Sequence, residues 1–158
     1  SYILKERLDS KSFNYPALRK YPKRRSTHKM KGSKQDLIKY RLLRAWDTLD
    51  DAKILAEKKK WNSTINRLYY ACYYAVMAIL LDSDLKPTTH NGAKSNFSEY
   101  FVLTNKIPKE LGKVYSQLFT WRQKGDYDDL FDFDKEKVMP YFEPVEKLIN
   151  TIEYILSS

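Results

Sequence analysis

The sequence predicts an all-α fold, an antiparallel bundle of four to five helices that follows a basic N-terminal arm. Only 4 Gly and 6 Pro occur among the 158 residues, whereas turn-rich β folds use more of both. From residue 33 onward, apolar side chains recur at the three- to four-residue spacing of amphipathic helices. No competing alternation typical of strands is evident. We therefore expect residues 33–158 to form one helical domain and residues 1–32 to form the arm.

The first two helices have recognisable start signals. Ser33 and Asp36 resemble a capping pair, and the apolar stripe that follows them continues to about residue 60. Asn62 could cap the second helix, which is expected to continue to about Asp82. A loop at 87–92 then leads into a short third helix rich in aromatic residues.

The remaining elements are punctuated by Pro, Gly and Asp. Pro108 suits the first turn of a fourth helix, which would end at a turn over residues 125–127. Asp134 is a good cap for the last helix. Pro144 predicts either a kink in that helix or a late start.

Nearly all the net charge belongs to the arm. Residues 1–29 carry nine Lys and Arg against Glu6 and Asp9, a net charge of +7 out of a total of +9. The helical part alone is close to neutral, so its composition does not indicate a nucleic-acid footprint. The arm is either an accessory or added segment in front of Met30, or a segment that docks on a neighbouring subunit through its aromatic residues.

Other features limit the class of protein. The uncharged run from Leu68 to Leu81 is 14 residues long, shorter than the roughly 18–20 residues of a membrane span, so we expect a buried helix and no membrane partner. A single cysteine, Cys72, cannot form an internal disulfide, which fits a reducing cytoplasm. On its apolar helix, Cys72 is expected to serve in packing.

Arg67 stands at the start of that buried run and is the strongest candidate for a functional residue. A guanidinium stays charged and is rarely buried without a partner, so Arg67 needs either a carboxylate or an anion such as phosphate. Helical periodicity places Tyr70 and Tyr74 on the same face as Arg67. Two interpretations stay open: Arg67 pairs with an aspartate of the acidic loop, or it holds a phosphate.

The acidic loop is not a convincing metal site. Its carboxylates lack the glycine and the closing glutamate of a calcium loop, and two His with one Cys cannot build a standard structural zinc site. We expect no metal and no cofactor, and a solvated loop with helix caps. The aspartates concerned are Asp126, Asp128, Asp129, Asp132 and Asp134.

Three motifs in order resemble the signature of HEPN-domain proteins over about residues 35–157. They are Asn66-Arg67-x-Tyr69-Tyr70-Ala71-x-Tyr73, Thr89-His90-x-Gly92, and Arg122-x-x-Gly125-Asp126-Tyr127-Asp128. The resemblance implies a helical bundle that usually dimerises. It also implies kinship with metal-independent ribonucleases, many of them toxins paired with a small nucleotidyltransferase antitoxin.

In those ribonucleases an arginine holds the scissile phosphate, and a histidine that follows after four to six intervening residues transfers protons. Arg67 matches the arginine, but Tyr74 stands where the histidine would fall. A tyrosine with a pKa of about 10 is a poor general base near neutrality. His90 could supply an imidazole instead; alternatively it is an exposed loop residue that caps the third helix.

The resemblance therefore favours a HEPN-like module that binds nucleotide or RNA and partners a nucleotidyltransferase. An active ribonuclease toxin is the second hypothesis, and a purely structural homo-oligomeric bundle is the third. We expect a homodimer in each case. The candidate catalytic residues are Arg67, Tyr74 and His90, and the candidate ligand-binding residues are Asn66, Tyr70, Arg122, Asp126 and Tyr127.

Overall fold

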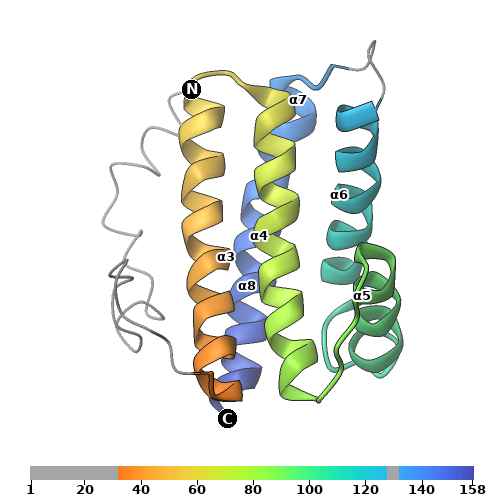
Figure 1. Cartoon of the computed structure of the whole chain (residues 1–158). Coiled ribbons are helices and arrows are strands. Elements are labelled where there is room, and N and C mark those ends of the chain that lie inside the picture. Colours follow the sequence, from red (N-terminus) through yellow and green to blue (C-terminus); the bar gives the residue numbers. More distant parts are fainter. Residues whose placement is uncertain (1–31, 128–131) are drawn as a thin grey trace.

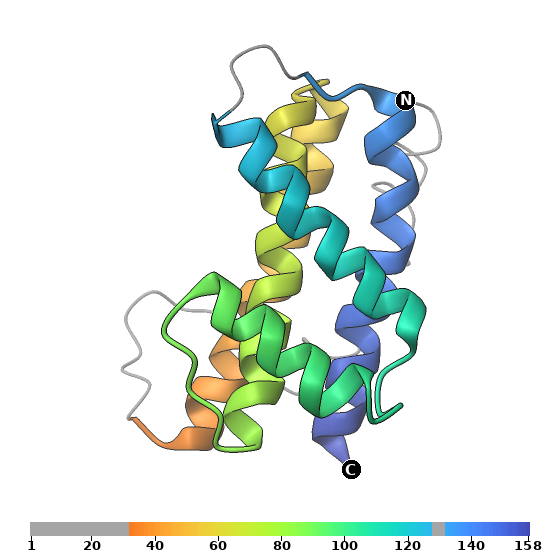
Figure 2. The same ribbon diagram turned by 90° about the vertical axis from the view of Figure 1, so that its right-hand side faces the viewer.

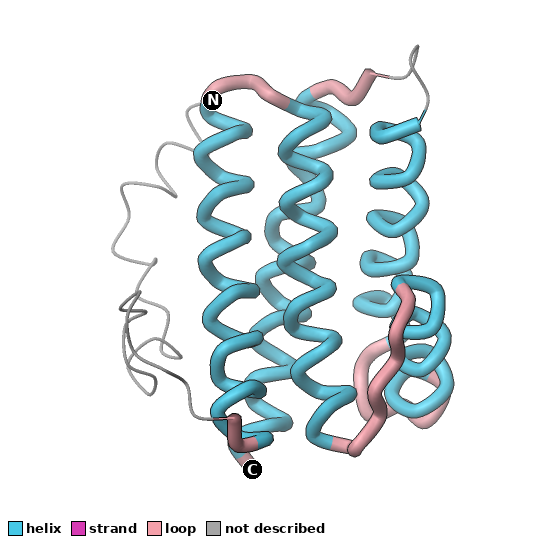
Figure 3. Tube along the Cα trace, viewed as in Figure 1, coloured by secondary structure: helices cyan, strands magenta, loops and turns pink. Residues whose placement is uncertain are grey.

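The computed structural model describes residues 32–127 and 132–158, so the arm lies outside the described residues except for Gly32. Long helices run antiparallel to one another along the bundle (Figure 1). Within the described ranges there is no strand, and helices make up most of the chain (Figure 3). The predicted all-α class is confirmed. The long helices are α3 (Lys34–Glu57), α4 (Trp61–Asp82), α6 (Lys109–Tyr127) and α8 (Phe142–Ser157).

Short elements complete the two connections on either side of α6. Helix α5 (His90–Phe97) continues directly as the π-helix η2 (Ser98–Val102), and together they cross the outer side of α4 beside the start of α6 (Figure 2). The short helix α7 (Lys135–Val138) and the 3₁₀ turn η3 (Met139–Tyr141) precede α8.

Side-chain caps begin three of the helices. The Ser33 hydroxyl accepts the Asp36 N–H at 3.0 Å, which confirms that predicted cap. The Asp134 carboxylate accepts the Lys137 N–H at 2.9 Å, so Asp134 is a cap as predicted, but of the short α7 and not of the last helix α8. The Thr89 hydroxyl accepts from the backbone N–H of the third α5 residue and begins α5. Each cap satisfies a backbone donor that the first helical turn would otherwise leave unpaired.

The structure corrects the predicted start of the second helix. Helix α4 begins two residues earlier than a cap at Asn62 would require, at Trp61, and Asn62 does not cap it. Instead, the Asn62 carbonyl oxygen accepts the Phe133 N–H at 2.9 Å, and its amide donates to Asp132 at 3.3 Å. Asn62 therefore ties the start of α4 to the segment that precedes α7, a long-range contact that local sequence does not reveal.

Two other predicted boundaries were wrong. The expected loop at 87–92 ends at Thr89, because that residue starts α5. The expected turn at 125–127 is the last turn of α6, and Gly125 has no positive φ. A Cβ on Gly125 would lie 3.3 Å from the Phe133 ring, so glycine here allows a close approach rather than a turn.

The late start predicted from Pro144 is confirmed. Pro140 lies in η3, and Pro144 falls in the first turn of α8, where a missing N–H removes no helical hydrogen bond.

Helix α4 is the central element of the bundle. It packs against α3, α5, α6 and α8, and an apolar stripe along one of its sides is buried, as expected from the uncharged run. Cys72 belongs to that stripe, and burial raises the pKa of its thiol, in agreement with a packing role. No helix in the described part of the chain is both long and apolar enough to cross a membrane. The buried stripe comprises Ile65, Tyr69, Cys72, Val76 and Ile79.

Candidate functional site

The loop between α4 and α5 brings His90 against the tyrosines of α4. The Tyr69 hydroxyl lies 2.7 Å from His90 Nδ1, and the His90 ring centroid is 4.5 Å from that of Tyr73 and 5.8 Å from that of Tyr70. His90 is the first residue of α5 and is partly buried, while Thr89 provides the cap. The interpretation of His90 as an exposed capping residue is therefore wrong.

The surroundings of His90 favour its neutral form. Burial lowers the pKa of the imidazole, and the nearby positive charge of Arg122 lowers it further. Burial raises the pKa of the Tyr69 hydroxyl, so that group stays protonated at neutral pH. Two neutral groups thus meet in this hydrogen bond.

Arg122 reaches the same tyrosines from α6. Its Nη1 donates to the Tyr70 hydroxyl at 3.2 Å. Its guanidinium carbon lies 5.0 Å from the centroid of the Tyr69 ring and 5.7 Å from that of Tyr70, within the range of cation–π attraction. The structure thus places the predicted ligand-binding residues Tyr70 and Arg122 in direct contact.

Arg67 contacts Tyr70 from within α4. Its guanidinium carbon is 5.1 Å from the Tyr70 ring centroid, while Nε and Nη2 donate to the Asn66 carbonyl oxygen at 3.1 and 2.7 Å. An aspartate partner, one of the two interpretations left open, is not found among the described residues, where a neutral amide holds the guanidinium instead. Asn66, predicted to bind ligand, therefore orients Arg67. Arg67 also lines an open cavity of about 480 Å³ that reaches Gly125.

These residues form what we call the arginine–tyrosine cluster. It combines two guanidinium groups, three tyrosines and a neutral imidazole from three helices. Its members are Arg67, Tyr69, Tyr70, Tyr73, His90 and Arg122.

Tyr74 lies at the edge of this cluster. Its ring centroid is 6.2 Å from that of Tyr70, which agrees with the predicted shared face. Its hydroxyl accepts a hydrogen bond from Arg44 Nη2 on α3 at 3.1 Å, and the guanidinium carbon lies 5.0 Å from the ring centroid. The hydrogen bond from Arg44 to Tyr74 raises the pKa of that guanidinium. Tyr74 therefore links α3 to α4.

The acidic candidates are only partly described. Asp126 and Tyr127 belong to the last turn of α6, but their side chains lie outside the described part of the structure, as do Asp128 and Asp129 entirely. Among the described residues, no group of three or more His, Cys, Asp or Glu is placed to share a metal ion.

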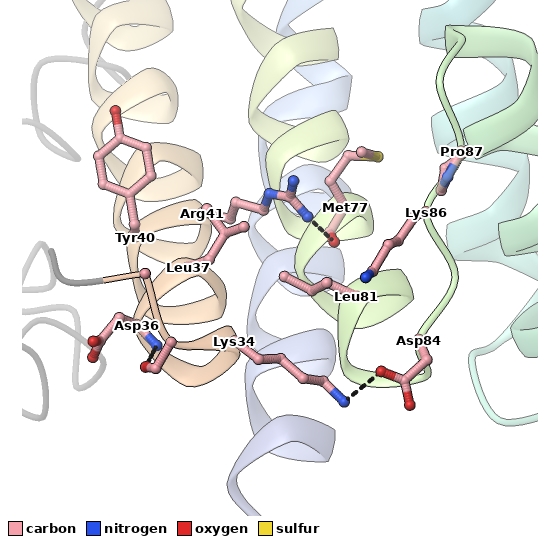
Figure 4. Close-up of a pocket in the computed structure, with 12 residues that line it drawn as sticks. Lys34, Asp36, Leu37, Tyr40, Arg41, Met77, Leu81, Asp84, Lys86 and Pro87 are labelled. Carbon is pink, nitrogen blue, oxygen red and sulfur yellow. Dashed lines mark hydrogen bonds and ion pairs between the residues drawn. The ribbon is translucent and has the colours of Figure 1, made fainter.

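A separate groove of about 710 Å³ opens between the start of α3 and the end of α4 (Figure 4). Arg41 Nη1 donates to the Met77 carbonyl at 3.0 Å, and burial lowers the pKa of this guanidinium. An ion pair of 3.0 Å between Lys34 and Asp84 joins the two helices at one end of the groove.

Sequence reasoning overlooked the polar role of Tyr69 and the contribution of Arg44. Tyr69 lies in the uncharged run that was expected to form a buried helix, and this expectation gave no sign of a role for its hydroxyl. The only available signal was the position of Tyr69 inside the same motif as Arg67. Nothing in the first helix marked Arg44 as a partner of Tyr74.

Comparisons with known proteins agree with this arrangement. The sequence-family model of the HEPN domain matches residues 38–157 of this chain. A UPF0332 protein from Thermotoga maritima is 39% identical over 123 residues, which cover 78% of this chain and 93% of that protein.

Two relatives come from Methanocaldococcus jannaschii. The protein named "Putative toxin MJ0142" is 27% identical, with 72% of this chain and 78% of that protein covered. The protein named "Putative toxin MJ0605" is 35% identical, with 52% and 62% covered. From the match to most of its helical part and the identity to these relatives, we conclude that the chain belongs to the HEPN domain family.

Proposed function

We propose that this protein binds the phosphate of a nucleotide or of RNA at the arginine–tyrosine cluster. The observation that carries the proposal is the environment of Tyr70, which has the guanidinium of Arg67 at 5.1 Å and that of Arg122 at 5.7 Å from its ring. The planar fork of a guanidinium matches phosphate oxygens in geometry as well as in charge. A phosphate that contacts both side chains would offset the repulsion between their charges.

The aromatic members suit the rest of such a ligand. Tyr70 and Tyr73 are partly exposed, so a base could stack on either ring. Stacking on tyrosine is a common way for proteins to hold single-stranded bases without reading their sequence. The same cluster could thus take both the phosphate and the base of one nucleotide unit.

Binding of a labelled single-stranded RNA, followed by fluorescence anisotropy, tests this function. A lost charge-assisted hydrogen bond should weaken binding roughly 10- to 100-fold in Arg67→Ala and in Arg122→Ala. Lys113→Ala is the charge-matched control, because Lys113 is exposed on α6 and is not part of the cluster. Equal losses in all three variants would mean that net charge alone attracts RNA, and would refute a site at the cluster.

Metal-independent RNA cleavage is the second candidate function. Membership of the HEPN family and the names of the two Methanocaldococcus relatives favour it. Incubation of labelled RNA with the protein and EDTA would detect it. Cleavage that disappears in Arg67→Ala would support an active ribonuclease, whereas intact RNA would favour binding alone.

We place this activity in a toxin–antitoxin pair with a nucleotidyltransferase. Membership of the HEPN family and the names of the two Methanocaldococcus relatives support this. If a nucleotidyltransferase is encoded beside this gene, its co-expression with this protein should yield a complex that co-purifies. Separate elution of the two proteins would contradict the partnership.

We further propose a two-fold dimer formed through α4. One face of α4 is only partly buried within the chain, and it carries Tyr70, Tyr73, Tyr74 and Met77. Light scattering should give the dimer mass at micromolar concentration, and a monomer mass would refute this assembly.

A further inference from the structure

Tyr69 is held in one position by the rings around it. Its side chain is fully buried. The rings of Tyr115 and Tyr73 both stack against it, each with its centroid 6.0 Å from that of Tyr69, at interplanar angles of 11° and 21° respectively. Phe119 packs edge-on at 6.1 Å, and Arg122 lies 5.0 Å from the ring centroid. The hydroxyl therefore cannot swing away from His90 without disturbing three aromatic neighbours.

The hydrogen bond between these residues has a preferred direction. A tyrosine hydroxyl carries one proton, and a neutral imidazole carries one proton on either nitrogen. His90 Nδ1 and the Tyr69 hydroxyl lie 2.7 Å apart, and the buried Tyr115 hydroxyl, whose ring stacks on that of Tyr69, has no hydrogen-bond partner of ordinary geometry among the described residues. If Nδ1 carried the proton instead, the Tyr69 O–H would have to donate to the neighbouring Tyr115 hydroxyl. The buried Tyr115 O–H would then lack an acceptor, which costs about 1–3 kcal/mol.

We infer that Tyr69 is a positioning residue, which donates its hydroxyl proton to His90 Nδ1 and keeps the imidazole proton on Nε2. This inference deepens the proposed phosphate site and rests on it for its functional meaning. The second nitrogen of His90 then offers an N–H donor to an anion held by Arg122. It does not offer a lone pair, so His90 in this state assists binding and is not a general base.

The other charged and titratable groups around His90 are compatible with this state. Tyr70 and Tyr73 face it from α4 with ring centroids 5.8 and 4.5 Å away, and burial raises the pKa of Tyr73, so that hydroxyl stays neutral. Arg122 faces it from α6. Lys94, one turn further along α5, places its Nζ 4.6 Å from the Phe119 ring centroid. Of these cations, Arg122 disfavours a positive charge on His90.

Nitrogen NMR of the imidazole tests the inference directly, because the chain contains only two histidines, His28 and His90. The full chain with His28→Gln leaves a single imidazole to observe. At neutral pH we expect a protonated Nε2 and an unprotonated Nδ1 that accepts a hydrogen bond. A proton on Nδ1 would overturn the inference, and this measurement needs no further substitution.

Tyr69→Phe in the same background removes the donor with little change of shape. The pKa of His90 should rise, because protonation of Nδ1 no longer displaces a hydrogen bond from tyrosine. Tyr73→Phe is the matched control, since its ring also contacts His90 but no hydrogen bond joins the two side chains. An unchanged pKa in Tyr69→Phe, or an equal rise in both variants, would overturn the role of Tyr69.

The RNA titration separates this inference from the proposed function. We expect Tyr69→Phe to weaken RNA binding a few-fold, because His90 would no longer be held with its Nε2–H ready to donate a hydrogen bond to the anion. If the nitrogen spectra show the expected proton on Nε2 while Arg67→Ala and Arg122→Ala leave RNA affinity unchanged, the phosphate site fails and the Tyr69–His90 arrangement stands. Failure of the spectra alone leaves the phosphate site intact and refutes the arrangement.

Discussion

Tyr74 occupies the position at which the resemblance to HEPN ribonucleases places a histidine. Its ring lies next to that of Tyr70, and its hydroxyl accepts a hydrogen bond from Arg44 of α3. Position 74 therefore lies between the cluster and α3. An imidazole there, with a pKa of about 6.5, could transfer protons near neutrality, a contribution of typically 10²–10⁴-fold. We expect Tyr74→His to create or raise RNA cleavage that EDTA does not inhibit, measured by gel analysis of a labelled RNA.

Two controls accompany this prediction. Tyr74→Phe removes the same hydroxyl without adding an imidazole and should show no gain. Arg67→Ala in the Tyr74→His background should abolish the gain, because the phosphate would no longer be held. A gain that survives Arg67→Ala would place the chemistry elsewhere in the protein.

His90 should make the folded state sensitive to acid. Its pKa is lowered in the folded chain, so the unfolded chain binds the proton first as the pH falls below about 6.5. The free energy of unfolding should therefore fall between neutral pH and the lowered pKa of the folded state. Urea unfolding at pH 7.5 and pH 5.5 measures this loss, which should be smaller in His90→Gln. An equal loss in both proteins would assign the acid sensitivity to carboxylates.

At the residue scale, the sequence predicted which side chains share one face of a helix. Arg67, Tyr70 and Tyr74 share a face because their spacing is fixed by the helix itself. The contact of Tyr70 with Arg122 and the placement of His90 depend on how α5 and α6 return to α4, which local spacing does not determine. The Asn66 amide as partner of Arg67 was missed because neighbouring helix positions usually point in different directions.

At the scale of elements, the close approach of α6 to η2 depends on Gly112. A Cβ at this position would lie 2.9 Å from both methyl groups of Val102, whose branched side chain has little rotamer freedom. Alanine gains up to about 1 kcal/mol in helix propensity, but overpacking costs about 1–3 kcal/mol. We expect Gly112→Ala to lower the free energy of unfolding, measured in urea.

Val102→Ala provides the complementary variant. The double variant Gly112→Ala/Val102→Ala should be more stable than the sum of the two single changes predicts, because the clash disappears when the valine methyl groups are removed. Strict additivity of the two effects would show that Gly112 and Val102 do not limit the approach of these elements.

The elements themselves were predictable to different degrees. The caps at Ser33 and Asp134 were foreseen because capping uses residues within one turn. The π-helix η2 and the interruption at η3 were not fully foreseen, since irregular turns of this kind follow from packing between helices. The contact from Asn62 to Phe133 spans 71 residues and leaves no local pattern.

At the scale of the whole molecule, most of the net charge and the described core lie in different parts of the sequence. The described helices begin at Lys34, and the buried core extends from Ile38 to Ile152. Residues 1–29 carry +7 of the net charge of +9. The helical domain can thus meet the requirements of folding while the arm adds long-range attraction for polyanions.

A protein that starts at Met30 should therefore keep its helical circular dichroism and melt cooperatively. Its affinity for single-stranded RNA should fall, and so should the salt dependence of binding, by a slope of about 0.7 for each phosphate that the arm no longer neutralises. Titrations at several KCl concentrations measure both quantities for the two lengths of chain. Arg122→Ala in each length should cause a similar decrease in affinity if arm and cluster act independently. Aggregation or unfolding of the shortened protein would instead mean that the arm is part of the core.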